Sequence, residues 1–238
     1  MSDRGVRFVL KPIVFVASLG PFFYLVWAAY TGNLSANPLA DLTNETGVWT
    51  LRFICITLAI TPLRKLTGWN PLVKFRRMAG LFAFFYGTLH LTTYAIVDRF
   101  AGLDQAAGWV EALSLGHAPG GALIASTLRS LAKSIGEDIY KRPFITVGFT
   151  AWLSMLPLAI TSTAGWIRRL GGKRWNRLHR LVYLTGILGP LHYWWLVKAD
   201  VSRPLTYAAV VAALLGVRLF WNRARRAPAP ARASATPA

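Results

Sequence analysis

Long stretches without charge constrain this chain more than any other feature of its sequence. A bilayer core about 30 Å thick is crossed by about 20 apolar residues in a helix. Six stretches fit that requirement and predict six transmembrane helices, at residues 12–30, 47–63, 78–97, 143–161, 181–197 and 204–221. Only Arg52 and Arg218 are charged within them, and we expect Arg218 to snorkel to the interface. The fold class is therefore an all-α, polytopic membrane helix bundle.

The distribution of positive charge predicts the orientation of these helices. Lys and Arg number 27 against 9 Asp and Glu, and most of the basic residues fall in residues 1–11, 64–77, 168–180 and the segment after 221. They follow no single helical face, so nucleic acid is excluded as a partner. With six spans these four segments share one side, which the positive-inside rule makes the cytoplasm. Both termini are then cytoplasmic.

This topology divides the chain into three parts. Residues 1–11 form an N-terminal tail, residues 12–221 form the membrane domain, and the Pro/Ala-rich residues 222–238 form a disordered cytoplasmic tail. The loop at 98–142 faces the periplasm. The single cysteine, Cys55, excludes a disulfide framework and a thiolate cluster.

Two histidines are predicted to lie at one depth in different helices. His90 follows Arg77 by 13 residues, and His192 follows Arg180 by 12 residues, in two helices that both run outward. At 1.5 Å per residue both imidazoles lie about 18–20 Å from the cytoplasmic edge. Ionisable groups at that depth usually have a function. A single histidine there could equally well form only a hydrogen bond to a neighbouring helix. Haem iron takes axial histidines, so the pair predicts a b-type haem site.

His179 predicts a second, inner site. It precedes His192 by 13 residues at the cytoplasmic end of the same predicted helix, which turns the two side chains by about 220° from each other. Either a kink at Gly186, Gly189 and Pro190 brings them to one face, or His179 serves a different helix. The matching level of the neighbouring helix holds Arg76 and Arg77 instead of histidine.

Other candidate side chains receive weaker predictions. Arg52 pairs with a haem propionate or snorkels; Arg76 is favoured for a site role, whereas Arg174 and Arg180 are favoured for topology. His117 in the outer loop is an ordinary exposed histidine. Trp194 and Trp195 are interfacial anchors.

Several motifs together are similar to one family. They are residues 60–66 (ITPLRKL), 75–80 (FRRMAG), 89–95 (LHLTTYA), 141–148 (KRPFITVG), 158–163 (LAITST), 172–184 (GKRWNRLHRLVYL) and 192–198 (HYWWLVK). In this order they resemble the MsrQ family, formerly YedZ, within the ferric reductase-like transmembrane superfamily. The resemblance covers about residues 10–220.

The resemblance implies a b-type cytochrome subunit in the bacterial inner membrane. Such subunits take electrons from the quinol pool or a flavin reductase and pass them to MsrP, a periplasmic molybdopterin enzyme that reduces methionine sulfoxide. The implied cofactors are one or two haems b, with His90, His192 and His179 as ligands and Arg76 at the fourth position, and FMN. The subunit would transfer electrons and leave the catalytic step to its partner.

The periplasmic loop is longer than the resemblance leads us to expect. Within it, apolar residues between Leu123 and Ile139 recur at helical spacing opposite Arg129, Lys133 and Glu137. This pattern predicts an amphipathic helix on the outer membrane surface, which either shapes the partner's docking surface or covers lipid.

The sequence argues against two other functions, a complete nicotinamide-dependent reductase and a transporter. A complete ferric reductase or NADPH oxidase needs a nicotinamide domain, but no G-x-G-x-x-G fingerprint is present. A ferric reductase-like oxidoreductase with another acceptor stays open. A transporter would place carboxylates within its spans, and the six predicted spans contain none.

Overall fold

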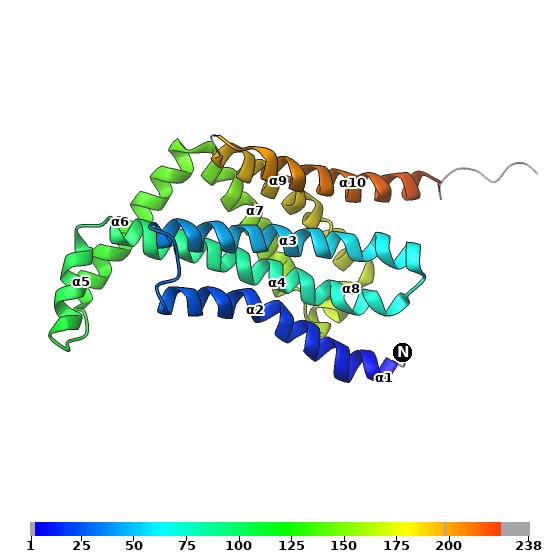
Figure 1. Cartoon of the computed structure of the whole chain (residues 1–238), viewed down its shortest axis with the longest axis horizontal. Coiled ribbons are helices and arrows are strands. Elements are labelled where there is room, and N and C mark those ends of the chain that lie inside the picture. The colour runs from blue at the N-terminus through cyan, green and yellow to red at the C-terminus, as the bar shows by residue number, and fades with distance from the viewer. Residues whose placement is uncertain (1–2, 198, 225–238) are drawn as a thin grey trace, which may run out of the picture.

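The structure, a computed structural model, describes residues 3–197 and 199–224, where all regular secondary structure is helical. The elements are α1 (Asp3–Gly5), η1 (Val6–Leu10), α2 (Lys11–Tyr30), α3 (Pro38–Thr67), η2 (Asn70–Leu72), α4 (Val73–Thr92), η3 (Thr93–Phe100), α5 (Gln105–Ser114), α6 (Gly121–Lys141), α7 (Pro143–Ile160), α8 (Ala164–Leu178), α9 (Leu181–Leu196) and α10 (Ser202–Ala224). They form one bundle whose long axis is horizontal in Figure 1.

Five helical stretches are long and apolar enough to cross a membrane: Val6–Tyr30, Pro38–Thr67, Asn70–Phe100, Pro143–Ile160 and Ser202–Trp221. They coincide with five of the six predicted spans. The first three begin six to nine residues before the predicted starts, because polar and basic residues continue each helix past its apolar part. With these longer bounds Asp41, Glu45 and Asp98 fall inside candidate spans, in the parts that extend beyond the predicted ones.

The predicted span at 181–197 forms α9, a helix of 16 residues that is shorter than the other five. It nevertheless lies inside the bundle, packed against α7, α3 and α10. At 1.5 Å per residue it is about 24 Å long. A six-span topology therefore stays a prediction that depends on α9.

Local signals fix where the helices begin and end. The Asn37 side chain accepts a hydrogen bond from the Ala40 N–H and Pro38 occupies the first turn of α3, which ends at Gly68 with φ of 69°. Thr163 caps α8 in the same way through the Trp166 N–H. Gly68 supplies the left-handed conformation that closes a helix without steric cost.

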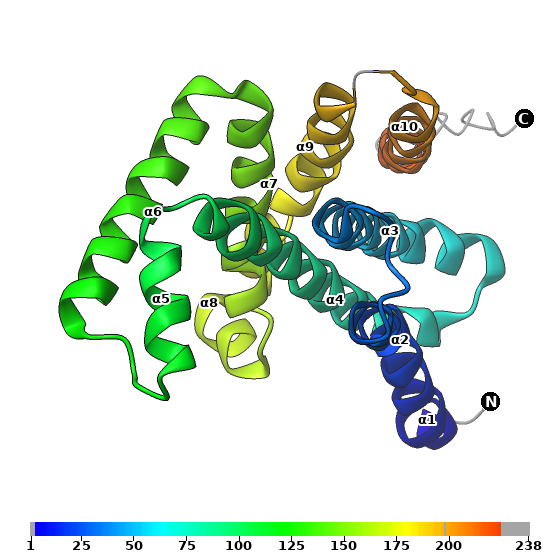
Figure 2. The same ribbon diagram turned by 60° about the vertical axis from the view of Figure 1, so that its left-hand side comes forward.

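The helices pack in pairs around the membrane core. α3 packs mainly against α4, and α7 against α9, while α10 covers α9 and α3 (Figure 1). The view in Figure 2 shows α2 on the flank of the α3–α4 pair. The N-terminus, the α3–α4 connection and the end of α10 gather at one end of the bundle, and α5 and α6 lie at the other.

Tyr86 of α4 fastens α2 to this core. Its hydroxyl donates to the Ser18 carbonyl at 2.7 Å and accepts from the Phe22 N–H at 3.2 Å. The hydroxyl thus bridges a backbone N–H and a backbone carbonyl of α2. The bridge lies beside Pro21, which has no N–H to donate to the helix. The Tyr86 ring stacks on Phe53 of α3 with centroids 5.4 Å apart. Outside this contact, large apolar side chains of α2 such as Phe23 and Trp27 are more than half exposed, as lipid-facing residues are.

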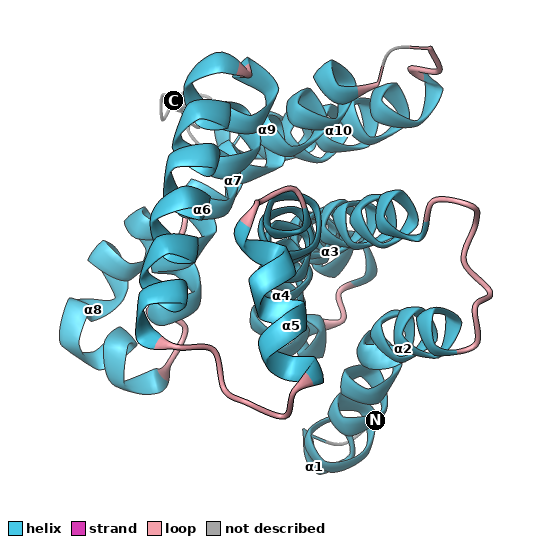
Figure 3. Cartoon of the chain, turned by 90° about the vertical axis from the view of Figure 1, so that its left-hand side faces the viewer, coloured by secondary structure: helices cyan, strands magenta, loops and turns pink. Residues whose placement is uncertain are grey.

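The outer loop contains two helices. The amphipathic helix predicted within it is confirmed as α6, whereas α5 was not predicted. Figures 2 and 3 show α5 and α6 side by side at the edge of the bundle. α6 also packs against α7 and η3, so part of its apolar face contacts protein.

At the other end of the chain, residues 222–224 continue α10, which differs from the predicted disordered tail; the rest of that tail, 225–238, lies outside the described residues. At the N-terminus, residues 3–11 of the predicted tail are helical and lead directly into α2.

Candidate functional site

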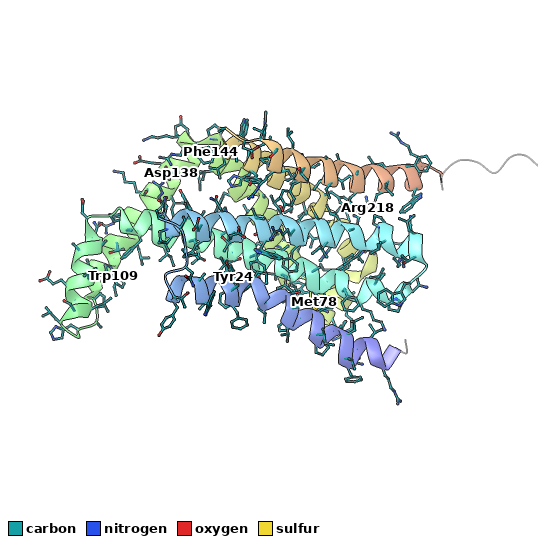
Figure 4. The ribbon with its side chains drawn as sticks, viewed as in Figure 1. Tyr24, Met78, Trp109, Asp138, Phe144 and Arg218 are labelled. Carbon is teal, nitrogen blue, oxygen red and sulfur yellow. The ribbon has the colours of Figure 1, made fainter. Side chains whose placement is uncertain are left out.

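Two cavities lie one above the other between α3, α4, α7 and α9. The cavity at the α6 end of the bundle, named the outer cavity for that position, has a volume of about 340 Å³ and is lined by both His90 and His192. The inner cavity, of about 410 Å³, is lined by His179 and Arg76. Ile54, Met155 and Thr185 line both cavities and form the wall between them. In Figure 4, Phe144 marks the level of the outer cavity and Arg218 that of the inner one.

The outer cavity orients His90 through the backbone of α3. His90 Nδ1 lies 2.9 Å from the Thr43 carbonyl oxygen, an acceptor only. The Nδ1 nitrogen therefore carries the proton and donates it, and the lone pair remains on Nε2. The His90 ring also lies against Gly47, where an added Cβ would be 3.1 Å from Nδ1.

His192 has the same arrangement with α7. Its Nδ1 donates to the Phe144 carbonyl oxygen at 2.6 Å, and its ring lies over Gly148. A Cβ at Gly148 would come within 2.6 Å of Nδ1, closer than real Cβ atoms approach. Both imidazoles thus use a carbonyl at one helix position and a glycine four residues later. Those two positions are neighbours on a helix surface, and the missing side chain lets the ring reach the carbonyl.

The two rings face the same space. Their centroids are 6.0 Å apart and their planes cross at 77°. A metal between two imidazole nitrogens, with bonds of about 2 Å, requires a centroid separation of roughly 6 Å. The described residues contain no group of three His, Cys, Asp or Glu side chains suited to a metal ion. Two imidazoles alone suit a metal whose other ligands come from a cofactor.

The outer end of this cavity is covered by α6 and η3. Asp138 of α6 is buried and accepts from the Tyr94 hydroxyl at 2.6 Å. It also pairs with Arg99 and Arg142, each at 3.2 Å. Tyr94, Arg99 and Arg142 all line the cavity, together with Ile135 and Ile139 of α6. Asp138 therefore holds the cover in place.

Replacing Asp138 with alanine is expected to release α6 from the bundle. The change leaves two guanidinium groups and a hydroxyl without their shared acceptor, at a cost of about 2–3 kcal/mol. Hydrogen exchange of the amides in residues 121–141 should accelerate more than tenfold. The matched control is Glu137→Ala, since Glu137 is exposed and forms its salt bridge with Lys141 of the same helix. Equal exchange in the two variants would show that Asp138 does not hold the cover.

His179 lies in the inner cavity, but not where the sequence predicted it. α8 ends at Leu178 and α9 begins at Leu181, so His179 and Arg180 form a turn between two helices. The prediction of one continuous helix through both histidines was wrong, and no kink is needed to reconcile their directions. The basic segment before His179, predicted as a loop, is itself helical and turns at Gly171, which has φ of 71°.

The His179 ring is held between α7 and α8. It stacks on Trp175 with centroids 3.7 Å apart, and its Nε2 lies 3.1 Å from the Thr161 hydroxyl. Burial and the positive charge of Arg76 lower the pKa of His179, so the imidazole is neutral at pH 7 and able to act as a ligand. His179 and Arg76 line the same cavity without a histidine opposite.

Comparisons with known proteins show which family the chain resembles. The profile of the ferric reductase-like transmembrane component family matches residues 46–189. A relative from Ralstonia nicotianae is 49% identical over 92% of this chain and 87% of its own length. Another, from Xanthomonas campestris pv. campestris, is 47% identical over 100% of this chain and 98% of its own length. Both are protein-methionine-sulfoxide reductase heme-binding subunits MsrQ.

The chain belongs to the MsrQ family. A third relative, from Herminiimonas arsenicoxydans, is 45% identical over 92% of this chain and 88% of its own length, and carries the same name. No solved structure matches the chain.

Some features of this MsrQ-family chain were missed from the sequence. Arg218, predicted to snorkel, instead turns inward, where its guanidinium donates to the Leu58 carbonyl and lies over the Tyr183 ring. Arg180, favoured for topology, lines the inner cavity. Gly47 and Gly148 gave no signal beyond being glycines one turn after a helix position that faces a histidine.

The remaining candidates lie away from both cavities. Arg52 packs over the Trp49 ring at 4.4 Å and lines neither cavity. His117 is exposed in the turn after α5, and Arg174 is exposed on α8. Trp194 and Trp195 are each about half exposed on α9, as expected of anchors at an interface.

Proposed function

We propose that this MsrQ-family chain is a b-type cytochrome subunit that carries electrons across the bacterial inner membrane to a periplasmic, MsrP-type methionine sulfoxide reductase. One observation carries the proposal: His90 and His192 from two helices face one cavity at 6.0 Å, each with its Nδ1 fixed to a backbone carbonyl. The names of its relatives, which are heme-binding subunits of this reductase system, support it.

The residues of the outer cavity fit a haem. Within the described residues both Nε2 atoms have no hydrogen-bond partner and carry lone pairs, as axial ligands require. Glycines from all four surrounding helices line the space: Gly47, Gly87, Gly148 and Gly189. When bound, haem supplies an iron that accepts and gives up single electrons. The surrounding apolar side chains exclude water, and Asp138 holds α6 over the outer end.

We infer a second, inner site at His179 and Arg76. The chain rises from His179 through α9 to His192, about 20 Å further along the axis. Among the described residues, Ile54, Met155 and Thr185 are the ones that line both cavities, so they separate the two proposed sites. A second haem held by His179 would extend the route toward the other face. Arg76 lies near enough for its charge to act on His179, but the geometry provides no second imidazole.

The proposed orientation puts the inner cavity on the cytoplasmic side, with α9 as the fifth of six spans. Its support is the gathering of the N-terminus, the basic α3–α4 connection and the end of α10 at one end of the bundle (Figure 1). Electrons then enter from quinol or a cytoplasmic flavin reductase and leave under α6. The catalytic step belongs to the partner enzyme.

Proteoliposomes containing the full chain test this function. A quinol, or NADH with a flavin reductase, is supplied to one face, and an MsrP-type enzyme with methionine sulfoxide to the other. We expect a reduced b-type α-band that is reoxidised only when both enzyme and methionine sulfoxide are present. Absence of a haem spectrum, or a haem that stays reduced under those conditions, would refute the proposal. Denaturing the partner enzyme beforehand provides the control.

A further inference from the structure

The charge of the inner cavity differs from that of the outer one. In the outer cavity Arg99 and Arg142 are paired with Asp98 and Asp138. Among the residues that the structure describes, those lining the inner cavity include no Asp or Glu but four arginines from three parts of the fold: Arg76, Arg77, Arg180 and Arg218. None of these four forms a salt bridge with a carboxylate of the described residues.

Arg218 lies within the apolar stretch of α10 and is half-buried. Its guanidinium donates one hydrogen bond to the Leu58 carbonyl of α3, and its centre lies 5.3 Å from the Tyr183 ring centroid. Its Nε–H is buried and has no partner in the described part of the protein. A guanidinium has five N–H donors in a planar fork, and the Nε–H of Arg218 is left available for an oxyanion.

Arg76 strengthens this positive field instead of neutralising it. It is partly buried on α4, and its charge repels Arg218 as well as acting on His179. Arg77 and Arg180 are more exposed and stand at the opening of the cavity. Convergence of like charges in a space of low dielectric is unfavourable unless an anion compensates it.

The remaining lining suits a flat, aromatic molecule. Trp175 and Tyr183 line the cavity with aromatic side chains, and Thr57, Gly80 and Ala83 line it with small ones. A Cβ added at Gly80 would lie 3.8 Å from the Thr57 methyl, an ordinary contact distance. A ligand with a planar ring system and an anionic group could therefore contact the aromatic side chains with its rings and the arginines with its anion.

We propose that the inner cavity is an anion-binding site in which Arg218, supported by Arg76 and Arg180, holds the carboxylate or phosphate group of a planar cofactor. Charge-assisted, forked hydrogen bonds from arginine fit both groups. The carboxylate source is a haem propionate and the phosphate source is FMN. The inference rests on the proposed function only in placing a cofactor in this cavity, because the outer site does not use Arg218.

The test compares Arg218→Gln with Arg223→Gln in the full chain, purified in lipid nanodiscs. Both arginines belong to α10, but Arg223 is exposed and lines neither cavity. Haem and flavin per polypeptide are measured after extraction, and FMN and riboflavin are titrated into each preparation. Loss of hydrogen bonds to a charged group weakens binding at least tenfold.

Each outcome decides between sources or against the site. If the anion is a propionate, Arg218→Gln loses haem beyond that held by His90 and His192, and flavin binding is unchanged. If it is a phosphate, FMN binds at least tenfold more weakly to Arg218→Gln, while riboflavin, which lacks the phosphate, binds both proteins equally. Cofactor content and FMN affinity equal to those of Arg223→Gln would overturn the proposal.

Two further variants keep the test valid if Arg218→Gln does not fold. Arg218→Lys retains the charge and should keep part of the affinity. Arg180→Gln lies in the turn before α9, outside the apolar spans, and should weaken the same ligand about threefold. A complete absence of haem in the wild-type chain would refute the proposed function instead, independently of Arg218.

Discussion

Replacing either His90 or His192 with alanine is expected to remove the outer haem, at least a tenfold fall in haem bound at that site. Each imidazole supplies one of the two axial positions, and its Nδ1 bond to a carbonyl fixes the ring so that no neighbour can take its place. The measurement is haem per polypeptide by pyridine haemochrome in the purified variants. The two variants should behave alike, since each histidine ring contacts a helix carbonyl and a glycine four residues later in the same way.

Two other histidines serve as references in that experiment. His117→Ala should retain the full wild-type haem content, because His117 is exposed in the outer loop. His179→Ala should lose only the haem of the inner site, leaving the outer one spectroscopically intact. If His90→Ala or His192→Ala kept its haem, the outer pair would not be the ligand pair.

Gly148→Ala is expected to disrupt the outer site almost as strongly, without touching a histidine. The new Cβ would lie 2.6 Å from His192 Nδ1 and 2.7 Å from Cε1, so the ring must move away from the Phe144 carbonyl. Overpacking of this kind costs about 1–3 kcal/mol. We expect haem affinity at the outer site to fall at least tenfold, with the low-spin spectrum partly lost.

The matched substitution for that test is Gly216→Ala on α10. An added Cβ there meets nothing within 4 Å, so haem content should be unchanged. Gly47→Ala should give an intermediate loss, because its Cβ would lie 3.1 Å from His90 Nδ1. Equal haem content in Gly148→Ala and Gly216→Ala would mean that haem ligation by His192 does not depend on the contact of its ring with Gly148.

The sequence was sufficient for the pairing of His90 with His192. Regular helices rise by a constant amount per residue, so counting from the basic boundaries Arg77 and Arg180 placed both imidazoles at one level. The structure brings them to one cavity. The same regularity located five long helices, and the apolar periodicity located α6.

The same reasoning failed where the chain turns without a sequence signal. His179 and Arg180 form a turn although neither glycine nor proline marks it, because backbone bonds to Trp175 and Arg177 close α8 there. Arg218 was expected at the interface because arginine usually snorkels, but the Leu58 carbonyl and the Tyr183 ring offer partners inside the bundle. The contacts of the histidine rings with Gly47 and Gly148 depend on which helices pack side by side, and this tertiary arrangement is not visible in the sequence.

The central claim is that one haem iron lies between His90 and His192, and the electron paramagnetic resonance spectrum of the oxidised wild-type chain in nanodiscs tests it most directly. The account predicts a low-spin ferric signal from two imidazole ligands, absent from both His90→Ala and His192→Ala. A wild-type spectrum without a low-spin signal, or the same bis-imidazole low-spin signal persisting in either variant, would contradict it.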